Sequence, residues 1–239
     1  GLSVVPLQGM PLFAPGMSVA VELLAALGRM GEALGEGDVL VVAQKIASKT
    51  EGRLLDVADI EASEDAMALS SNTGKAPQIC QVILSESSEI LRATPAAIIT
   101  RHKSGHVLAN AGIDSSNVEG GEGSTVLLWP EDCDASARAI RAEIAKHSGV
   151  RPAIVIADSL GRAWRIGTVG AAIGCAGLTV LDDRRGLDQD LFGRTLQATV
   201  IAVADAVAAM AVLAMGEGAE GTPAALVRGA ERWVSDDDG

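Results

Sequence analysis

The chain has 239 residues, a formal net charge of −12, 48% hydrophobic residues and only 2% aromatic residues. This length suits one large domain or two small ones that share a core, and the hydrophobic fraction excludes global disorder. The negative charge argues against DNA, RNA or an anionic membrane as a partner, and the shortage of aromatic side chains argues against a stacking platform for single-stranded nucleic acid.

The N-terminal part of the chain predicts a strand, a helix and a second strand. Residues 4–11 have the composition of a strand, and Ser18 is a candidate N-cap for a helix whose apolar residues recur at helical spacing. Residues 39–43 form an apolar run of strand length. We predict that a basic loop over residues 44–53 follows this buried strand, an arrangement that often places side chains at a ligand.

The middle of the chain predicts helices and then short strands. Residues 54–95 have a mainly helical composition, and residues 96–100 and 106–110 predict a pair of strands joined by a turn. A further strand is predicted over residues 124–129 and an amphipathic helix over residues 135–147.

The C-terminal part begins with an apolar strand over residues 152–157 that delivers Asp158 at its end. The remaining predicted elements are a strand at 177–181, a long helix at 196–215, a last strand at 224–228 and a disordered acidic tail at 236–238. Helices and strands alternate without a strict βαβ order, so we predict an α+β fold with mixed sheets and helices.

We predict that residues 1–239 form a single unit built from two interleaved subdomains. The first is discontinuous and comprises residues 1–60 and 150–239, and the second comprises residues 61–149. The cysteines Cys80, Cys133 and Cys175 show no CxxC spacing, so neither a zinc site nor a disulfide framework is expected. With no visible signal peptide, the expected compartment is the cytoplasm.

Three acidic residues lie in blocks of small residues that are far apart in the sequence. Asp114 lies in Ala-Gly-Ile-Asp-Ser-Ser-Asn, Asp158 in Ala-Asp-Ser-Leu-Gly-Arg, and Glu217 in Met-Gly-Glu-Gly. Carboxylates on tight loops suit a divalent metal that carries a nucleotide polyphosphate. Each also has a structural interpretation, because the two aspartates suit turns and the glycines beside Glu217 suit a helix C-cap. An acid at a helix C-terminus is opposed by the helix dipole, which a metal ion would offset.

A few basic residues complete the candidate site. Lys45 and Lys49 follow the predicted strand at 39–43 and suit phosphate contact, and Arg162 and Arg165 follow Asp158 and suit an anionic substrate. All four are equally compatible with surface positions. The chain has no GxxxxGK[ST] phosphate loop, no dinucleotide GxGxxG pattern and no nucleophile elbow. The residues alone therefore indicate a metal-dependent enzyme acting on phosphate esters and leave the reaction open.

Taken together, these blocks resemble the coenzyme F420-0:γ-glutamyl ligase family over nearly the whole chain. Single blocks are weakly specific, but their order and spacing together are strongly specific. The matching segments are residues 10–13, 37–42, 48–53, 110–117, 157–162, 190–193, 203–206, 215–217 and 226–229.

The resemblance implies a GTP-dependent ligase that adds L-glutamate to F420-0, a deazaflavin with a phospholactate arm, and then a second glutamate through a γ-linkage. It implies Mg²⁺ or Mn²⁺ at two sites, K⁺, an acyl-phosphate intermediate and an intertwined homodimer with a fold of its own. Neither nucleic acid nor a membrane is expected as a partner. A metal-dependent phosphohydrolase and a non-catalytic GTP-binding module remain the alternatives.

The resemblance also implies roles for particular residues. Asp114 and Asp158 would hold one metal, and Ser159 and Glu217 the second. Lys45, Lys49, Arg162 and Arg165 would serve catalysis. The residues implied to contact GTP are Met10, Pro11, Leu12, Phe13, Gln44, Lys45, Lys49, Asn117, Met215, Gly216, Glu217, Gly218, Ala219, Glu220, Gly221 and Thr222.

The chain departs from the family pattern at two positions. Position 159 is Ser where relatives often carry Thr, and the hydroxyl needed for metal ligation is retained. Ile166 stands after Arg165 where some relatives carry a second arginine, which changes the charge available to grip the phospholactate arm or glutamate.

Overall fold

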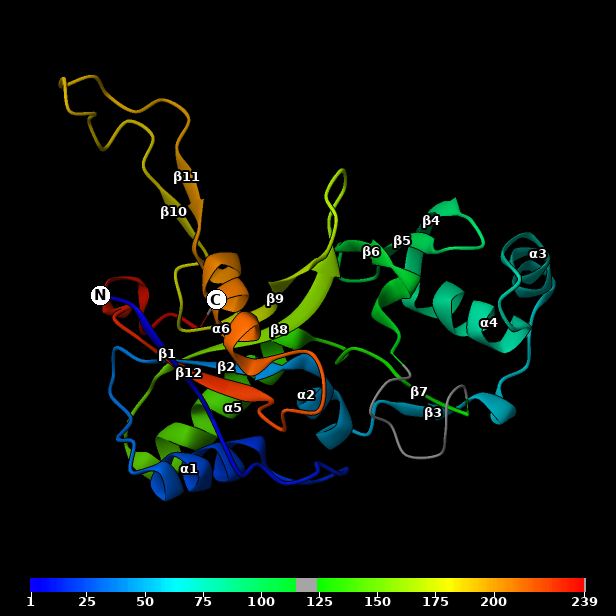
Figure 1. The fold of residues 1–239 in the computed structure, drawn as a ribbon, viewed down its shortest axis with the longest axis horizontal. Coiled ribbons are helices and arrows are strands. Elements are labelled where there is room, and N and C mark those ends of the chain that lie inside the picture. The colour runs from blue at the N-terminus through cyan, green and yellow to red at the C-terminus, as the bar shows by residue number, and fades with distance from the viewer. Residues whose placement is uncertain (115–123, 239) are drawn as a thin grey trace.

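A five-stranded sheet with the order β1-β12-β2-β8-β9 forms the centre of the computed structural model, which describes residues 1–114 and 124–238 (Figure 1). β2 and β8 run parallel, whereas the other neighbouring pairs are antiparallel. The sheet is therefore mixed, and the predicted α+β class is confirmed. Its strands are β1 (Ser3–Pro6), β2 (Val39–Ala43), β8 (Ala153–Gly161), β9 (Thr168–Ala176) and β12 (Ala224–Arg228).

Helices cover both faces of this sheet. Because side chains alternate along a strand, Leu40 and Val42 of β2 face one core, and Val39 and Val41 face another. The first core includes helices α1 (Val19–Met30) and α5 (Cys133–Ser148), and the second includes α6 (Val203–Met215). The predicted cap of the first helix is confirmed, since Ser18 Oγ accepts a hydrogen bond of 3.1 Å from the Val21 backbone N–H.

Smaller elements pack beside the sheet. A three-stranded sheet lies next to two helices that have a small core of their own (Figure 1). The two helices are α3 (Glu64–Thr73) and α4 (Pro77–Glu86), and the three strands are β4 (Ser87–Ala93), β5 (Ile98–His102) and β6 (Val107–Ala109). Two further strands pair with each other: β3 (Leu54–Asp56) and β7 (Thr125–Leu127). Short 3-10 helices occur at Val57–Asp59, Asn110–Gly112 and Glu231–Trp233. The proposed division into two interleaved subdomains stays a prediction.

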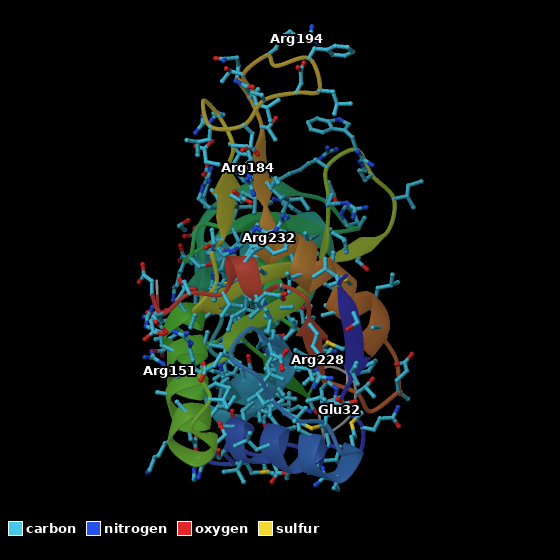
Figure 2. All side chains as sticks on the ribbon, turned by 90° about the vertical axis from the view of Figure 1, so that its left-hand side faces the viewer. Glu32, Arg151, Arg184, Arg194, Arg228 and Arg232 are labelled. Atoms are coloured by element: carbon cyan, nitrogen blue, oxygen red, sulfur yellow. The ribbon has the colours of Figure 1, made fainter. Side chains whose placement is uncertain are left out.

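A long arm extends away from the body of the molecule (Figure 1). Its base is the antiparallel pair β10 (Leu181–Asp183) and β11 (Val200–Ala202). Local ion pairs organise it, including Arg184 with Asp182 at 2.7 Å and Arg194 with Asp190 at 2.7 Å. Figure 2 shows Arg184 along the arm and Arg194 at its far end, well beyond Arg228 and Glu32 in the body.

Several predicted elements require correction. Residues 44–50 form helix α2 (Gln44–Thr50) instead of a basic loop, because most residues of this segment are adequate helix formers. The segment 54–95 is only partly helical. The predicted helix at 196–215 begins only at Val203 and is preceded by β11. Of the predicted strand at 177–181, only Leu181 lies in a strand, as the first residue of β10, because β9 ends at Ala176 and Gly177 turns the chain with a φ of 70°.

The C-terminal tail is ordered up to Asp238, which corrects the prediction of disorder. The guanidinium of Arg141, whose side chain is buried, donates to the backbone oxygens of Pro152 at 2.9 Å and Ser235 at 2.6 Å, and it pairs with the Asp238 carboxylate. Arg151 pairs with the same carboxylate at 3.1 Å. A buried arginine needs such partners, and they hold the tail in place.

Burial raises the pKa of the Cys133 and Cys175 thiols to about 12, so neither is a reactive thiolate near neutral pH. Within the described residues, the helices are all too short or too polar to span a bilayer, and α6 has only 13 residues.

Candidate functional site

A cavity of about 720 Å³ opens where the parallel pairing of β2 with β8 ends, at Ala43 and Ala157. Ala43 and Ala157 are paired in register on these parallel strands, so the residues that follow them, Gln44 and Asp158, emerge side by side. The carboxyl ends of parallel strands are a common place for ligands. The cavity walls come from four segments: residues 10–13, 43–49 of β2 and α2, 157–159 of β8, and 212–223 at the end of α6, with Asp114 as a separate contributor.

Almost all predicted site residues converge on this cavity. The lining contains the metal candidates Asp114, Asp158, Ser159 and Glu217 and the lysines Lys45 and Lys49. It also contains the predicted nucleotide contacts Met10, Pro11, Leu12, Phe13, Gln44, Met215, Gly216, Gly218, Ala219, Glu220, Gly221 and Thr222. Residues separated by more than a hundred positions are thereby brought to one site.

Helix α2 supplies the two lysines. Lys45 and Lys49 are four residues apart, which places them on the same face of a helix, and both line the cavity. Lys45 Nζ forms an ion pair of 2.9 Å with Asp114 Oδ2, and each of these side chains is 28% exposed. Gln44 is buried, and its amide donates to Ser48 Oγ at 2.6 Å. The helix therefore presents positive charge to a cavity that also contains carboxylates.

Asp114 is held at the cavity by strained backbone and by a strand. Asn110, Ala111 and Gly112 have φ angles of 52°, 53° and 69°. For the two non-glycine residues this conformation costs on the order of 1–3 kcal/mol each, a strain that is often stored at functional sites. Asp114 itself exchanges two backbone hydrogen bonds with Leu127 of β7, at 3.1 and 2.8 Å.

Asp158 is the most buried of the three carboxylates. It lies within β8, which continues to Gly161, and not past the end of the strand as the sequence predicts. Burial raises the pKa of its carboxyl, and the nearby Asp114 charge acts in the same direction. Two donors oppose this shift: Trp129 Nε1 lies 2.9 Å from Asp158 Oδ2, and the Ser159 backbone N–H lies 2.8 Å from Oδ1.

Glu217 meets Ser159 across the cavity. The Ser159 hydroxyl donates to the Glu217 carboxylate, which joins β8 to the loop that follows α6. That loop is organised by Glu220, which accepts from the Gly218 N–H at 2.7 Å, and by Thr222, which donates to the Met215 carbonyl at 2.6 Å. Two oxygen pairs, Asp114 with Asp158 and Ser159 with Glu217, thus lie on the same cavity.

Two of the predicted site residues that the structure describes do not line the cavity. Arg162 and Arg165 lie on the exposed turn between β8 and β9, and neither lines the cavity. The turn also carries Trp164 and Ile166, whose side chains are fully exposed. Asn117, predicted to contact the nucleotide, lies outside the described residues.

The chemistry of the oxygen donors fits a divalent cation of the Mg²⁺ or Mn²⁺ type. Across residues 1–114 and 124–238, no three His, Cys, Asp or Glu side chains are grouped so as to hold a metal ion without other ligands. Carboxylates in pairs, with a hydroxyl, suit Mg²⁺, which is usually bound by one or two carboxylates together with substrate phosphates and water. A bound cation would also stabilise the charged form of a buried carboxylate that lies beside a second carboxylate.

One residue that binds a carboxylate of the candidate site is not predicted from the sequence. Trp129 ends the predicted strand at 124–129, and its N–H binds Asp158. The only signal in the sequence is that a chain with three tryptophans and no tyrosine places one of them after an apolar run. Nothing in that signal indicates a bond to a residue 29 positions away.

Comparison with known proteins links this geometry to one family. The family model described as F420-0:Gamma-glutamyl ligase matches residues 9–229. A coenzyme F420:L-glutamate ligase of Methanothermobacter thermautotrophicus is 42% identical over 229 residues, which cover 96% of this chain and 89% of that relative. Ligases with the same name from Methanopyrus kandleri and Haloarcula marismortui are 44% and 42% identical, covering 96% and 95% of this chain and 88% and 87% of those relatives.

Proposed function

The chain belongs to the F420-0:gamma-glutamyl ligase family, and we propose that it joins L-glutamate to coenzyme F420-0 in a reaction that converts GTP to GDP and phosphate. It is accordingly an enzyme, a ligase of coenzyme F420 biosynthesis. The use of GTP, of two divalent metal ions and of an acyl phosphate are our proposals, and so is the addition of a second glutamate.

The cavity suits a nucleoside triphosphate. Its volume of about 720 Å³ lies within the range of small-molecule sites, roughly 300–1,000 Å³. Lys45 and Lys49 place two positive charges along one wall, where they would bind phosphate oxygens. Residues 10–13 and 215–222 would enclose the rest of the nucleotide. The choice of guanine over adenine follows from the family resemblance.

The carboxylates and the serine hydroxyl would hold the divalent ions. Asp114 and Asp158 would bind one ion, and Ser159 and Glu217 the other, with nucleotide phosphates and water as further ligands. When bound, these ions would offset the negative charge that builds up on the phosphates during transfer. Lys45, which pairs with Asp114, would then also be available to the phosphates. The proposal of K⁺ rests on the resemblance alone.

The proposed reaction has two steps. First, a carboxylate oxygen of the acceptor attacks the γ-phosphorus of GTP, the bond to the β-phosphate oxygen breaks, and GDP leaves. The resulting acyl phosphate has a good leaving group, which a free carboxylate lacks. The glutamate amine then attacks the acyl carbon, the carbon–oxygen bond breaks, and the amine proton leaves with the phosphate. Lys45 and Lys49 would orient the phosphates, and Arg162 and Arg165 would hold the anionic acceptor if it reaches the β8–β9 turn.

The observation that carries this proposal is the convergence of three distant carboxylates and two lysines on one cavity in a chain of this family. The test is an assay with GTP, Mn²⁺, L-glutamate and F420-0, with each component omitted in turn and the products identified by mass. Glutamylated product only in the complete mixture supports the ligase.

The same assay separates the alternatives. GDP formation that does not require glutamate or F420-0 would point to a phosphohydrolase. GTP binding without turnover in the complete mixture would point to a nucleotide-binding module.

We also propose that the chain forms a homodimer. The arm between β10 and β11 exposes large apolar side chains, among them Leu187, Leu191 and Phe192, and the β8–β9 turn exposes Trp164 and Ile166. Exposed apolar side chains of this size are typical of protein interfaces. A second copy of the chain would cover these side chains. It would also explain why the arm extends away from the rest of its own chain (Figure 1).

A further inference from the structure

One buried tryptophan contacts both segments that carry the first pair of carboxylates. Trp129 is 1% exposed, and its Nε1 donates a hydrogen bond of 2.9 Å to Asp158 Oδ2. The same edge of the indole lies against Gly112, where an added Cβ would stand only 2.6 Å from Nε1. Gly112 is two residues before Asp114. The indole therefore fills the space between the Asp114 loop and strand β8.

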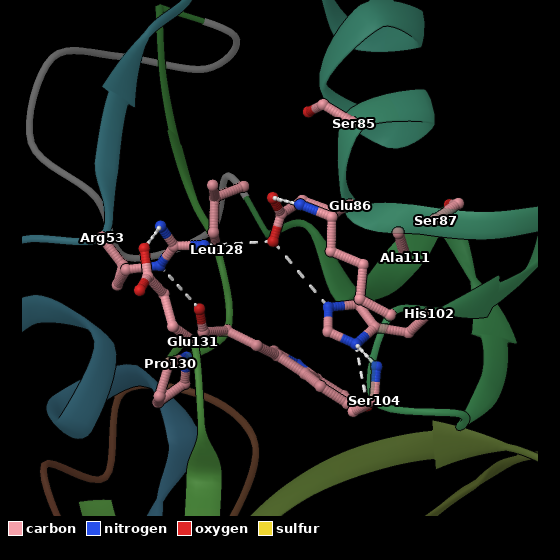
Figure 3. A network of polar contacts seen from close by, with 12 residues as sticks. Arg53, Ser85, Glu86, Ser87, His102, Ser104, Ala111, Leu128, Pro130 and Glu131 are labelled. Atoms are coloured by element: carbon pink, nitrogen blue, oxygen red, sulfur yellow. Dashed lines mark hydrogen bonds and ion pairs between the residues drawn. The ribbon is translucent and has the colours of Figure 1, made fainter.

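The backbone on both sides of this contact is fixed. Leu127, two residues before Trp129, holds the backbone of Asp114 through two hydrogen bonds. Arg53 Nε donates to the Trp129 carbonyl at 2.9 Å, and the Arg53 carbonyl accepts from the Leu128 N–H at 2.9 Å. Figure 3 shows Arg53 beside Leu128 and Pro130, reaching toward Glu131 and Glu86.

Two histidine rings support the indole. The ring centroids of His102 and His106 lie 4.9 and 5.4 Å from that of Trp129. Ser104 joins these histidines, because its hydroxyl lies 2.8 Å from Nδ1 of each ring. His102 in turn faces the buried Glu86, with 3.9 Å between Nε2 and Oε2 (Figure 3). The indole therefore has packing partners that keep its N–H directed at Asp158.

We propose that Trp129 is a positioning residue that fixes the carboxylates of Asp114 and Asp158 relative to one another for the ligase reaction. It does not line the cavity, and it acts through the Asp114 loop and strand β8, which it separates. The inference rests on the proposed function, since the geometry it maintains is that of the proposed metal and phosphate site. Residues that orient metal-binding carboxylates typically change metal affinity or activity by about 10- to 100-fold when altered.

The test removes the N–H while keeping the packing. Trp129→Phe retains an aromatic ring, and replacing Trp129 with 3-benzothienylalanine retains the full bicyclic shape but has sulfur in place of N–H. The matched control is Trp233→Phe, because Trp233 Nε1 donates to Asp182 Oδ2 at the same distance, 2.9 Å, at the base of the arm and outside the cavity. Circular dichroism and thermal unfolding identify any variant that is not folded.

Two measurements test whether Trp129 positions the carboxylates of Asp114 and Asp158. The first is Mn²⁺ affinity without substrates, measured from the electron paramagnetic resonance signal of free Mn²⁺. The second is the split between kcat and the KM for glutamate in the ligase assay. We expect both Trp129 variants to lose about 10- to 100-fold in Mn²⁺ affinity and in kcat, with an unchanged KM for glutamate and with Trp233→Phe at wild-type values.

Folded Trp129 variants with wild-type Mn²⁺ affinity and wild-type kcat would overturn the inference. Failure of the proposed function looks different. If the wild-type protein is an active ligase that does not bind Mn²⁺, the metal proposal fails and kcat of the variants decides the role of Trp129. If the wild-type protein binds Mn²⁺ but forms no glutamylated product, the ligase proposal fails. The Mn²⁺ affinity of the variants then tests whether Trp129 positions the two carboxylates.

Discussion

At the scale of single residues, the candidate site balances opposite charges in a partly buried cavity. Asp158 is disfavoured as an anion by burial and by Asp114, and Lys45 pairs with Asp114 at 2.9 Å. The sequence predicts these residues as site residues from their small neighbours and from the order of the blocks along the chain, and the structure brings them to one cavity. It does not predict the role of Trp129, because a hydrogen bond between the segment after β7 and strand β8 depends on how these segments pack.

Removing the Lys45 charge should weaken the site for phosphate. We expect Lys45→Met to lower kcat/KM for GTP by about 100-fold, since the variant loses a charge-assisted contact to phosphate and the 2.9 Å ion pair with Asp114, a loss of about 3 kcal/mol. Steady-state kinetics with varied GTP measure this. Lys146→Met, at an exposed position of α5, is the control and should keep wild-type kinetics. Equal kcat/KM for the two variants would contradict the role of Lys45.

Glu86 should make stability depend on acidic pH. Contacts with His102, Lys103 and Arg53 hold the pKa of Glu86 below its ordinary value of 4.5. The stabilisation is therefore complete above pH 4.5 and is lost as the pH falls below 4.5 through the lower folded-state pKa. We expect Glu86→Gln to lower the free energy of unfolding at pH 7 by about 2–4 kcal/mol, with a smaller difference from wild type in acid.

Urea unfolding at pH 7 and at pH 3 measures this difference. Glu89→Gln is the control, because Glu89 pairs with Arg101 at the surface and should change stability by less than about 1 kcal/mol. A gap between wild type and Glu86→Gln that stays constant with pH would be evidence against a lowered pKa.

At the scale of elements, strand β9 is fitted between helices on both faces of the sheet. Gly170 lies against α6, where an added Cβ would be 2.6 Å from the Ala208 carbonyl oxygen, and Gly174 lies against the backbone of Cys133 in α5. Gly170 and Gly174 are four residues apart and would normally lie on the same face of the strand. They contact helices on opposite faces because β9 has an extra residue, a bulge, opposite the register shift between Ile156 and Ala157 of β8. This bulge adjoins Asp158, as bulges often adjoin functional sites.

A methyl group at Gly170 should therefore disturb α6 and the Glu217 loop that follows it. We expect Gly170→Ala to lower the free energy of unfolding by about 1–3 kcal/mol, the usual cost of overpacking, and to reduce ligase activity. Thermal unfolding and the ligase assay measure the two effects. Gly161→Ala, in the same hairpin but with open space at its Cβ position, should unfold at the wild-type temperature. If Gly170→Ala also unfolds like wild type, α6 is not packed as closely as described.

The elements were predictable where one local signal dominates. The strands at 39–43 and 224–228 and the helix capped by Ser18 match, because apolar runs and an N-cap residue act locally. The sequence predicts no strand at β9, because residues 168–176 are mostly glycine and alanine, whose strand conformation comes from pairing with β8. The sequence predicts a loop in place of helix α2, because a segment of seven residues gives too little periodicity to indicate a helix.

At the scale of the whole molecule, the sheet and its helices form the body, while the arm extends from it (Figure 2). An isolated two-stranded ribbon is only marginally stable, and this one is organised largely by local ion pairs. Contacts with a second copy would supply the missing burial. The mixed architecture could be predicted from the order of elements, whereas the direction of the arm could not, because no pattern within residues 181–202 encodes it.

Charges placed on the arm should therefore prevent association. We expect the wild-type chain to sediment as a dimer and the double variant Leu191→Asp/Phe192→Asp to sediment as a monomer, because both side chains are largely exposed in the single chain and would be buried in the dimer. Analytical ultracentrifugation measures this. Asp substitution of Leu213, an equally exposed apolar residue on α6, serves as the comparison and should leave the dimer intact. A wild-type monomer, or a dimeric double variant, would contradict the proposed interface.

The central claim is that the cavity around Asp158 is the ligase site, and its most direct test is the rate of glutamylated F420 formation by Asp158→Asn. The matched control is Asp182→Asn, since Asp182 accepts the same kind of indole N–H bond at 2.9 Å away from the cavity. We predict that Asp158→Asn folds and loses at least about 100-fold in kcat, because several kcal/mol of transition-state stabilisation are removed, while Asp182→Asn stays within a few-fold of wild type. A folded Asp158→Asn protein that forms the product at the wild-type rate would contradict the assignment of the site.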